Sequence, residues 1–236
     1  MSLRHGRNVG IYINGTDLSG DLNSITPDSV QDLHDVTVFG NVGHSFYPGL
    51  AKDSGTIEGF YDSTSATVFQ AMLQLAPSYA MMIPFGQTLG DPVYANEEVM
   101  LKNNNVKGVV TDVNKISFSF DVDNYPFEPG KMLVAGKQTV ASGSTGTGTY
   151  VDNGAASGTT GGAGYLQIFG STPGTVAVIL QTSTTSTFTL YTSTTFTAAS
   201  TGTQRVTITS TTGSGAVAQY ARATWVGSVS TSTFAL

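Results

Sequence analysis

The residues that could support catalysis are few, and their spacing does not assemble a recognisable catalytic centre. His34 lies in the segment DSVQDLHDV, between Asp32 and Asp35 and shortly after Ser29. A hydrolytic triad needs a nucleophile and a base within hydrogen-bond distance, and a third group that orients the base. The segment has neither a nucleophile elbow nor a glycine-rich oxyanion turn. It therefore predicts a solvated polar loop, and we expect no catalytic residues in this chain.

Motifs for metals and cofactors are also incomplete. The segment DVDNYPFEPGKM begins like a calcium loop with Asp121 and Asp123, but its fifth and twelfth positions hold Tyr125 and Met132. An EF-hand needs Asp or Asn at the fifth position and Glu at the twelfth. The segment TGTGT lacks the lysine of a phosphate-binding loop, and the chain has no cysteine for a thiolate site. We expect no metal, no cofactor and no enzymatic activity.

The composition indicates a folded protein whose surface is unusually poor in charge. Only 11% of the 236 residues are charged, although 39% are hydrophobic; soluble proteins average about 25% charged residues. A net charge of −6 gives no basic footprint for gripping nucleic acid. The first residues lack the apolar core of a signal peptide, and no segment approaches the roughly 20 apolar residues of a membrane helix. We therefore expect synthesis in a cytoplasm and no membrane partner.

Charge divides the chain into two parts. Residues 1–140 contain 23 of the 26 charged residues, and residues 141–236 retain only Asp152, Arg205 and Arg222. The transition runs through a stretch rich in Gly, Ser and Thr, Val140–Gly164, which is typical of turns and linkers. We place a domain boundary near residue 145, which gives domains at 1–145 and 146–236.

The N-terminal part is dominated by strand patterns. In Asn114–Asn124 the apolar and polar residues alternate, which predicts a strand with one buried and one solvated face. Further strands are expected at Val9–Gly15, which ends in an Asn-Gly turn, and at Asp35–Gly40 and Gly55–Asp62, which flank a long connection. The residues Phe69, Met72, Leu73 and Ala76 recur at helical spacing, so one helix is expected over 63–77, ending at Pro77.

The C-terminal part has the composition of a mucin-like stalk but the pattern of a sheet. In residues 181–212, 20 of 32 residues are Ser or Thr, yet no proline follows Pro173. Threonine is β-branched and suits a pleated surface. We predict strands of an antiparallel sandwich at AVILQ, FTLY, RVTIT and YARATWV. Trp225 shares a face with Ala221 and Ala223 and is expected in the core, which weakens a carbohydrate platform built on Trp225 and Tyr220.

The order of these segments resembles that of the major tail tube proteins of long-tailed, non-contractile bacteriophages (siphophages). The segments GIYINGTDLSG, VTVFG and SFYPGLAKDSGTIEGFYD precede the expected helix and ISFSFDVDN, and the resemblance covers about residues 5–135. The C-terminal part is similar to a sandwich appended to some tail proteins. The resemblance implies a mainly-β fold: a tail-tube β-sandwich or partial barrel with one flanking α-helix, followed by a C-terminal antiparallel β-sandwich as a decoration domain.

Membership of this family would imply a structural protein of the virion tail. Copies would form hexameric rings that stack into a tube, the conduit for DNA ejection into the host. The partners would be further copies and other tail proteins, such as the tape measure, terminator and tail tip. DNA would pass through the lumen without specific binding. Because lysines in the lumen would grip phosphates, we expect the residues that face it to be Ser117, Ser119, Asp121 and Asp123.

Two segments are candidates for contacts between copies. The long connection contains Phe46, Tyr47 and Leu50, which we expect to join stacked rings; the alternative is an ordinary surface loop folded onto its own domain. The N-terminal arm with Arg4, His5 and Arg7 is either a contact with a neighbouring subunit or a disordered terminus.

Two other functions remain open at this stage. One is a capsid or tail decoration protein, or an adhesin, that binds host-surface glycans through the C-terminal sandwich. The other is an accessory module of an enzyme, which is disfavoured because no catalytic domain accompanies it.

Overall fold

A computed structural model of the chain shows a mainly-β protein built from antiparallel sheets. The structure describes residues 8–60, 78–108, 113–154, 161–169, 175–197, 202–208, 217–227 and 232–236. The chain divides into two compact units. Unit 1 comprises Met1–Ser19, Ala80–Glu97 and Glu128–Leu236, and unit 2 comprises Gly20–Tyr79 and Glu98–Phe127. Each unit is therefore assembled from segments that lie apart in the sequence.

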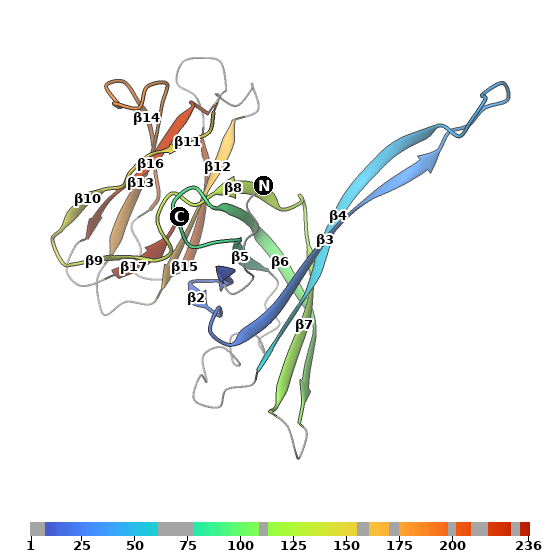
Figure 1. Cartoon of the computed structure of the whole chain (residues 1–236), viewed down its shortest axis with the longest axis horizontal. Helices are drawn as coiled ribbons and strands as arrows, with labels where there is room; N and C mark the ends of the chain where they lie inside the picture. The colour runs from blue at the N-terminus through green and yellow to red at the C-terminus, as the bar shows by residue number, and fades with distance from the viewer. Residues whose placement is uncertain are drawn as a thin grey trace. The chain divides into compact units, whose positions relative to one another are not determined.

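Unit 2 is a four-stranded antiparallel sheet in the order β3-β4-β7-β6 (Figure 1). Its strands are β3 (Leu22–Asp35), β4 (Phe46–Phe60), β7 (Lys115–Val122) and the second part of β6 (Pro92–Lys107). The central strand β7 confirms the expected alternation, because Ile116, Phe118 and Phe120 are buried while Ser117 and Ser119 are partly exposed. One face of the sheet is therefore apolar and the other polar.

The structure corrects the prediction for residues 22–60. Most of the expected long connection is strand, since β4 begins at Phe46, whereas the expected strand Asp35–Gly40 mostly forms the turn region between β3 and β4. The polar loop expected around His34 is also strand, with His34 opposite Tyr47. Pro48 and Gly49 obscure the pattern in sequence. This part of β4 pairs with β3 on one side and lies beyond the segment that pairs with β7 on the other, which is the edge position where proline is tolerated.

The first part of unit 1 is built around a tight hairpin. β1 (Tyr12–Ile13) pairs with β2 (Thr16–Asp17), and the turn between them confirms the expected Asn-Gly turn, with positive φ at Asn14 (47°) and Gly15 (74°). The Gly15 N–H donates to Gln167 Oε1 at 2.8 Å. This hairpin is followed in the sheet by β5 (Tyr79–Pro84) and the first part of β6, which also pairs with β8 (Glu128–Lys131).

The rest of unit 1 forms two antiparallel sheets that enclose a common core. One sheet has the order β15-β12-β17-β9, and the other has the order β10-β16-β13-β14 with β11 also paired to β16. Their apolar side chains, among them Ile168, Val178, Phe196 and Phe234, form one cluster. The strands are β9 (Gln138–Val140), β10 (Thr145–Thr147), β11 (Val151–Asp152), β12 (Gly162–Phe169), β13 (Val176–Ser183), β14 (Thr192–Thr195), β15 (Gly202–Ile208), β16 (Tyr220–Gly227) and β17 (Ser232–Ala235).

The sequence predicted three of the four C-terminal strands correctly. AVILQ lies in β13, RVTIT largely in β15 and YARATWV in β16, whereas FTLY does not form a strand. Phe188 has a φ of +52° in a turn, and it stacks beneath the Arg222 guanidinium, whose central carbon is 4.0 Å from the ring centroid. Burial of the aromatic ring in that turn outweighs the β propensity of the local sequence.

Two clasps, each an ion pair between segments distant in sequence, stabilise unit 1. Arg205 of β15 donates to Glu128 of β8 through Nη2 at 2.8 Å, and Tyr165 of β12 donates to the same carboxylate at 2.5 Å. Burial raises the pKa of Glu128, but the hydrogen bonds from Arg205 and Tyr165 together outweigh it, so the pKa lies below its ordinary value. Lys137 makes a comparable contact with Asp17 at 2.5 Å. These clasps join segments that are distant in sequence.

Three expectations fall partly or wholly outside what the structure tests. The predicted helix over 63–77 lies outside the described residues. The strand expected before it, Gly55–Asp62, is described as far as Phe60, where β4 ends. The arm residues Arg4, His5 and Arg7 also lie outside them. The division at residue 145 stays a prediction; unit 1 contains the whole of 146–236 together with segments of the first 145 residues.

Candidate assembly surface

The β3–β4 pair continues as a two-stranded ribbon beyond the rest of its sheet. β7 pairs with β4 only from Ser54 to Phe60, whereas β3 and β4 remain paired as far as Asp35 and Phe46. Figure 1 shows the ribbon projecting past the end of β7. An isolated two-stranded ribbon is at best marginally stable in water. The length of the ribbon therefore indicates that another chain or molecule covers it when the protein is functional.

The ribbon exposes apolar side chains to an unusual degree. Phe39 and Val42 at the tip are fully exposed, and on the strands Leu33 is 63%, Tyr47 67% and Leu50 85% exposed. These side chains lie on both faces of the ribbon, since successive strand residues such as Phe46 and Tyr47 point to opposite sides. So much exposed apolar surface on one short ribbon is typical of a site of association. The sequence predicted part of this surface through Phe46, Tyr47 and Leu50, but it missed the β3 side and the tip.

Hydrogen bonds order the base of the tip. Thr37 donates to Asp35 Oδ1 through its hydroxyl and, at 2.9 Å, through its backbone N–H. His44 Nδ1 lies 3.0 Å from Asp35 Oδ2, and the His44 ring stacks on Phe46 with centroids 6.0 Å apart. The hydrogen bonds from Thr37, with a further contribution from His44, hold the pKa of Asp35 below its usual range. The apolar tip is thus presented by a locally ordered turn.

The exposed face of the four-stranded sheet is polar and organised in rows across the strands. Thr26, Thr56, Ser119 and Asn103 form one such row, with Asn103 Nδ2 donating to Ser119 Oγ at 3.1 Å. The expected lumen residues Ser117, Ser119 and Asp121 lie on this face. Asp123 lies beyond the end of β7, where its carboxylate accepts the Asn124 N–H at 3.0 Å.

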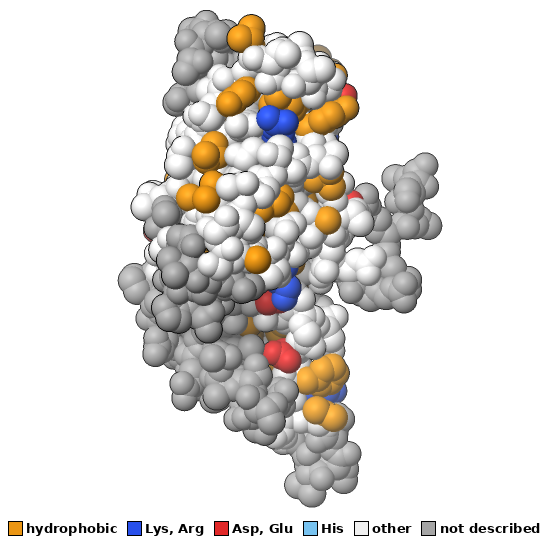
Figure 2. Space-filling view, turned by 90° about the vertical axis from the view of Figure 1, so that its left-hand side faces the viewer, with side chains coloured by type: hydrophobic (Ala, Val, Ile, Leu, Met, Phe, Trp, Pro, Cys, Tyr) orange, Lys and Arg blue, Asp and Glu red, His pale blue; other side chains and the backbone are white. Residues whose placement is uncertain are grey.

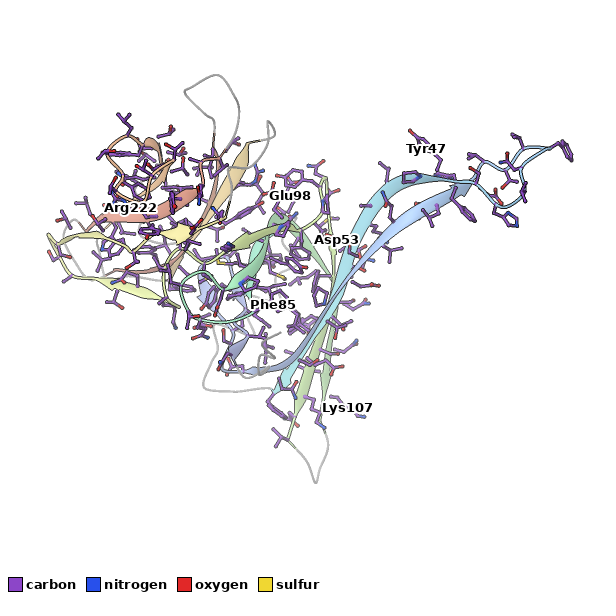
Figure 3. The ribbon with its side chains drawn as sticks, turned by 45° about the horizontal axis from the view of Figure 1, so that its top comes forward. Tyr47, Asp53, Phe85, Glu98, Lys107 and Arg222 are labelled. Carbon is purple, nitrogen blue, oxygen red and sulfur yellow. The ribbon has the colours of Figure 1, made fainter. Side chains whose placement is uncertain are left out.

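This face also contains lysines that the sequence reasoning missed. Lys102 Nζ contacts Asp121 Oδ2, and Lys52 Nζ lies 3.8 Å from the same oxygen. At the far end of the sheet Lys107 lies opposite Lys115, and Figure 3 shows Lys107 at the end remote from Tyr47 on the ribbon. Lys52 alternates with Ser54 and Thr56 along the strand, so the sequence pattern could have placed its side chain on the same face. No pattern in the sequence predicts the bulge that places Lys102 there.

The four-stranded sheet is open at its β3 edge and only partly covered at its β6 edge. β3 is the last strand in the order, and within the described residues no backbone bond is made from its outer edge. At the other edge, β6 pairs with β5, but β5 has 6 residues against the 16 of β6 and cannot cover that edge completely. The remainder of β6, to Lys107, has no neighbour on that side among the residues described. Such edges are templates for pairing with another chain.

The structure does not bring the candidate catalytic or metal-binding residues together. Asp35 contacts His44 rather than His34, and Asp121 contacts lysines. In the described part of the chain no three His, Asp or Glu residues converge on a possible metal site. None of the helical residues described there forms a segment long and apolar enough to cross a membrane.

The surface of the C-terminal sandwich is largely uncharged. Figure 2 shows a face on which neither charged nor hydrophobic side chains predominate, in keeping with its Ser- and Thr-rich sequence. Trp225 packs against the core, edge-to-face with Phe234 at 5.6 Å, which confirms the expectation of a core residue. Tyr220 instead packs edge-to-face with Tyr150 at 5.2 Å. The two aromatic residues therefore form no common platform.

Several solved structures share features of this fold. A chain from the tail of an empty gene transfer agent particle, refined with C6 symmetry, is 13% identical over 53% of this chain and 99% of that chain, with a TM-score of 0.42. A chain of the sheath-tube complex of an extracellular contractile injection system in the extended state is 11% identical over 55% and 92% of the two chains, with a TM-score of 0.45. The SPP1 Dit protein, from a hub adsorption apparatus of phages infecting Gram-positive hosts, is 12% identical over 96% and 98%, with a TM-score of 0.35. No family model and no curated protein matches the sequence. At these identities and TM-scores, the functional inference has to come from the surface of this chain itself.

Proposed function

We propose that this chain is a structural protein of a virion tail, of the siphophage major tail protein type, that assembles into stacked hexameric rings forming the tube for DNA ejection. The observation that supports this most directly is a sheet with one open edge, along β3, and one partly covered edge, along β6, from which an exposed apolar ribbon projects. The proposed protein has a structural role and no enzymatic one. Its working location is the tail, after synthesis in the host cytoplasm.

The strand directions suit head-to-tail closure of a ring. The pairs β3–β4, β4–β7 and β7–β6 are all antiparallel, so β6 runs opposite to β3. If copies share one orientation along a common axis, β6 of one copy meets β3 of the next in antiparallel fashion as well. The sheet can then continue from copy to copy, and closure removes its edges.

The resulting barrel has suitable dimensions for a conduit. Six copies contributing four strands each, at a strand spacing of about 4.8 Å and a tilt of about 40°, give a barrel roughly 48 Å across its backbone. This leaves room for a DNA double helix. In the proposed tube the polar face, with Ser117, Ser119 and Asp121, lines the lumen.

The ribbon then serves contacts between stacked rings. Its apolar residues project past β7, in the direction of the barrel axis, so they can reach the next ring. Phe46, Tyr47 and Leu50 on β4 are three of the anchors, and covering them removes apolar area from water. The same interface explains how a chain with few charged residues avoids random aggregation: most of its exposed apolar surface has a specific partner. Further tail proteins, among them a tape measure, a terminator and a tail tip, would meet the tube ends.

Electron microscopy of the purified protein tests the overall proposal. Rings or tubes are expected as the concentration rises. Discrete particles that give signals on a glycan array would instead support the decoration or adhesin function, for which Leu190 and Tyr191 are among the exposed apolar residues of the sandwich.

Cross-linking tests the lateral pairing of β6 with β3. The chain has no cysteine, so introduced pairs can be interpreted without background. Asn103 lies in the same row as Thr26, and barrel shear shifts that register, so N103C is combined in turn with S24C, T26C and D28C. One combination should give an oxidised ladder ending in a closed hexamer. A ladder that stops at a dimer for every combination would exclude head-to-tail ring closure.

A further inference from the structure

Asp121 is contacted by lysines from both neighbouring strands. In the register of the sheet it lies opposite Ser54 on β4 and Met100 on β6, so Lys52 and Lys102 approach it diagonally from opposite sides. Lys102 Nζ is in direct contact with Asp121 Oδ2, and Lys52 Nζ is 3.8 Å from it. The Asp121 side chain is only 16% exposed, whereas those of Lys52 and Lys102 are 65% and 48% exposed. A single, mostly buried carboxylate therefore forms ion pairs with two solvent-accessible ammonium groups.

The charge balance of the polar face depends on this carboxylate. The face carries four acidic residues and four lysines: Asp28, Glu58, Glu98, Asp121, Lys52, Lys102, Lys107 and Lys115. Its formal charge is therefore balanced even though the whole chain has a net charge of −6. Loss of Asp121 would make the face net positive and would release both lysines at one place. A low affinity for DNA is thus not explained by a lack of lysines on this face.

The same place offers neutral hydrogen-bond donors. A depression of about 470 Å³ is lined by Lys102, by the two carboxylates Asp28 and Asp121, and by the polar residues Thr26, Ser54, Asn103 and Ser119. Hydroxyl and amide groups beside lysine ammonium groups form the usual donor set for phosphate oxygens. Loss of Asp121 would leave Asp28 as the remaining carboxylate beside these donors and would bring the depression closer to the chemistry of a phosphate-binding site.

We propose that Asp121 keeps this face from binding the DNA backbone, by holding Lys52 and Lys102 in an ion cluster and repelling phosphate from the depression beside them. The role of this device in a lumen rests on the function proposed above. The ion cluster itself lies within the sheet of a single chain, so its effect on DNA binding can be measured on unassembled protein. It replaces the simple expectation of a lumen without lysines by one in which the central lysines are neutralised.

Binding of a fluorescent DNA duplex, followed by anisotropy below the concentration at which the protein assembles, tests the proposal. D121N should bind more tightly than the wild type, and the binding should weaken steeply with salt. Two released lysines correspond to a log–log salt slope of about −1.8, or roughly a 12-fold loss between about 50 and 200 mM salt. D121E, which keeps the charge, should behave as the wild type, and the triple variant K52A/K102A/D121N should lose the gain.

D28N is the matched control, because it removes an equal charge from the same row and from the lining of the same depression, but leaves in place the carboxylate that contacts Lys52 and Lys102. A gain in D121N well above that of D28N supports a specific role for the cluster. Equal binding by the two variants would show that only net charge matters and would overturn the proposal. D121S is measured alongside, since serine already occupies two other β7 positions on this face, so the test does not depend on one variant folding. Tube formation is scored separately by microscopy. Tubes without any DNA-binding gain would refute only this inference, whereas a wild type without tubes would refute only the proposed function.

Discussion

Removal of the two aromatic anchors on β4 should raise the concentration needed for tube growth by about two orders of magnitude. Phe46 is 55% and Tyr47 67% exposed. Covering an aromatic side chain removes about 200 Å² from water, so these fractions correspond to about 240 Å² in total. At about 25 cal/mol per Å² this area contributes about 6 kcal/mol. Incomplete coverage and the cost of ordering the ribbon leave roughly half, or about 3 kcal/mol.

The assay is sedimentation or light scattering of the purified protein over a concentration series. About 3 kcal/mol corresponds to a roughly 100-fold higher critical concentration for F46A/Y47A. Because both side chains are exposed in the single chain, the melting temperature of dispersed protein should change little. The matched control is L190A/Y191A, which removes two residues of comparable exposure, 82% and 52%, from the sandwich. Normal tube growth by F46A/Y47A, or equal impairment of both variants, would refute the role of the ribbon.

Three further outcomes follow from the contacts described. Lysine at both Asp121 and Asp123 should retain DNA in the tube in a salt-dependent manner, and unaffected DNA passage would remove these residues from the lumen. Because the pKa of Glu128 is held below its ordinary 4.5, its clasp stabilises the fold at neutral pH and is lost as pH falls through the lowered value; the melting temperatures of wild type and E128Q should therefore converge in acid. G15A should destabilise unit 1 by more than 1 kcal/mol, roughly, because a β-carbon at this φ of +74° would lie 2.3 Å from a backbone oxygen. G143A, with φ of +67° and open space around it, should cost only the backbone strain, which denaturant titration of both variants can compare.

The sequence alone determined the features that depend on local pattern. Alternation identified β7 and its buried face, the Asn-Gly dipeptide identified the β1–β2 turn, and the absence of proline from the Thr-rich tract distinguished a folded sandwich from a stalk. These features were predictable because a strand of period two and a turn with positive φ are encoded by adjacent residues. Phe46 and Tyr47 are exposed, but they lie on a strand rather than in the expected loop, and their role between rings stays a prediction.

The tertiary structure decided which segments pair with which. The ribbon exists because residues 22–35 and 46–60 pair over their whole length, and neither segment alternates clearly enough to show this alone. The lysines around Asp121 are brought there by two strands that lie roughly 70 and 20 residues away in the chain, and one of them sits at a bulge. Phe188 leaves its expected strand because Arg222 covers its ring. Strand pairing, bulges and cation–aromatic contacts depend on neighbours distant in sequence, so no local pattern can specify them.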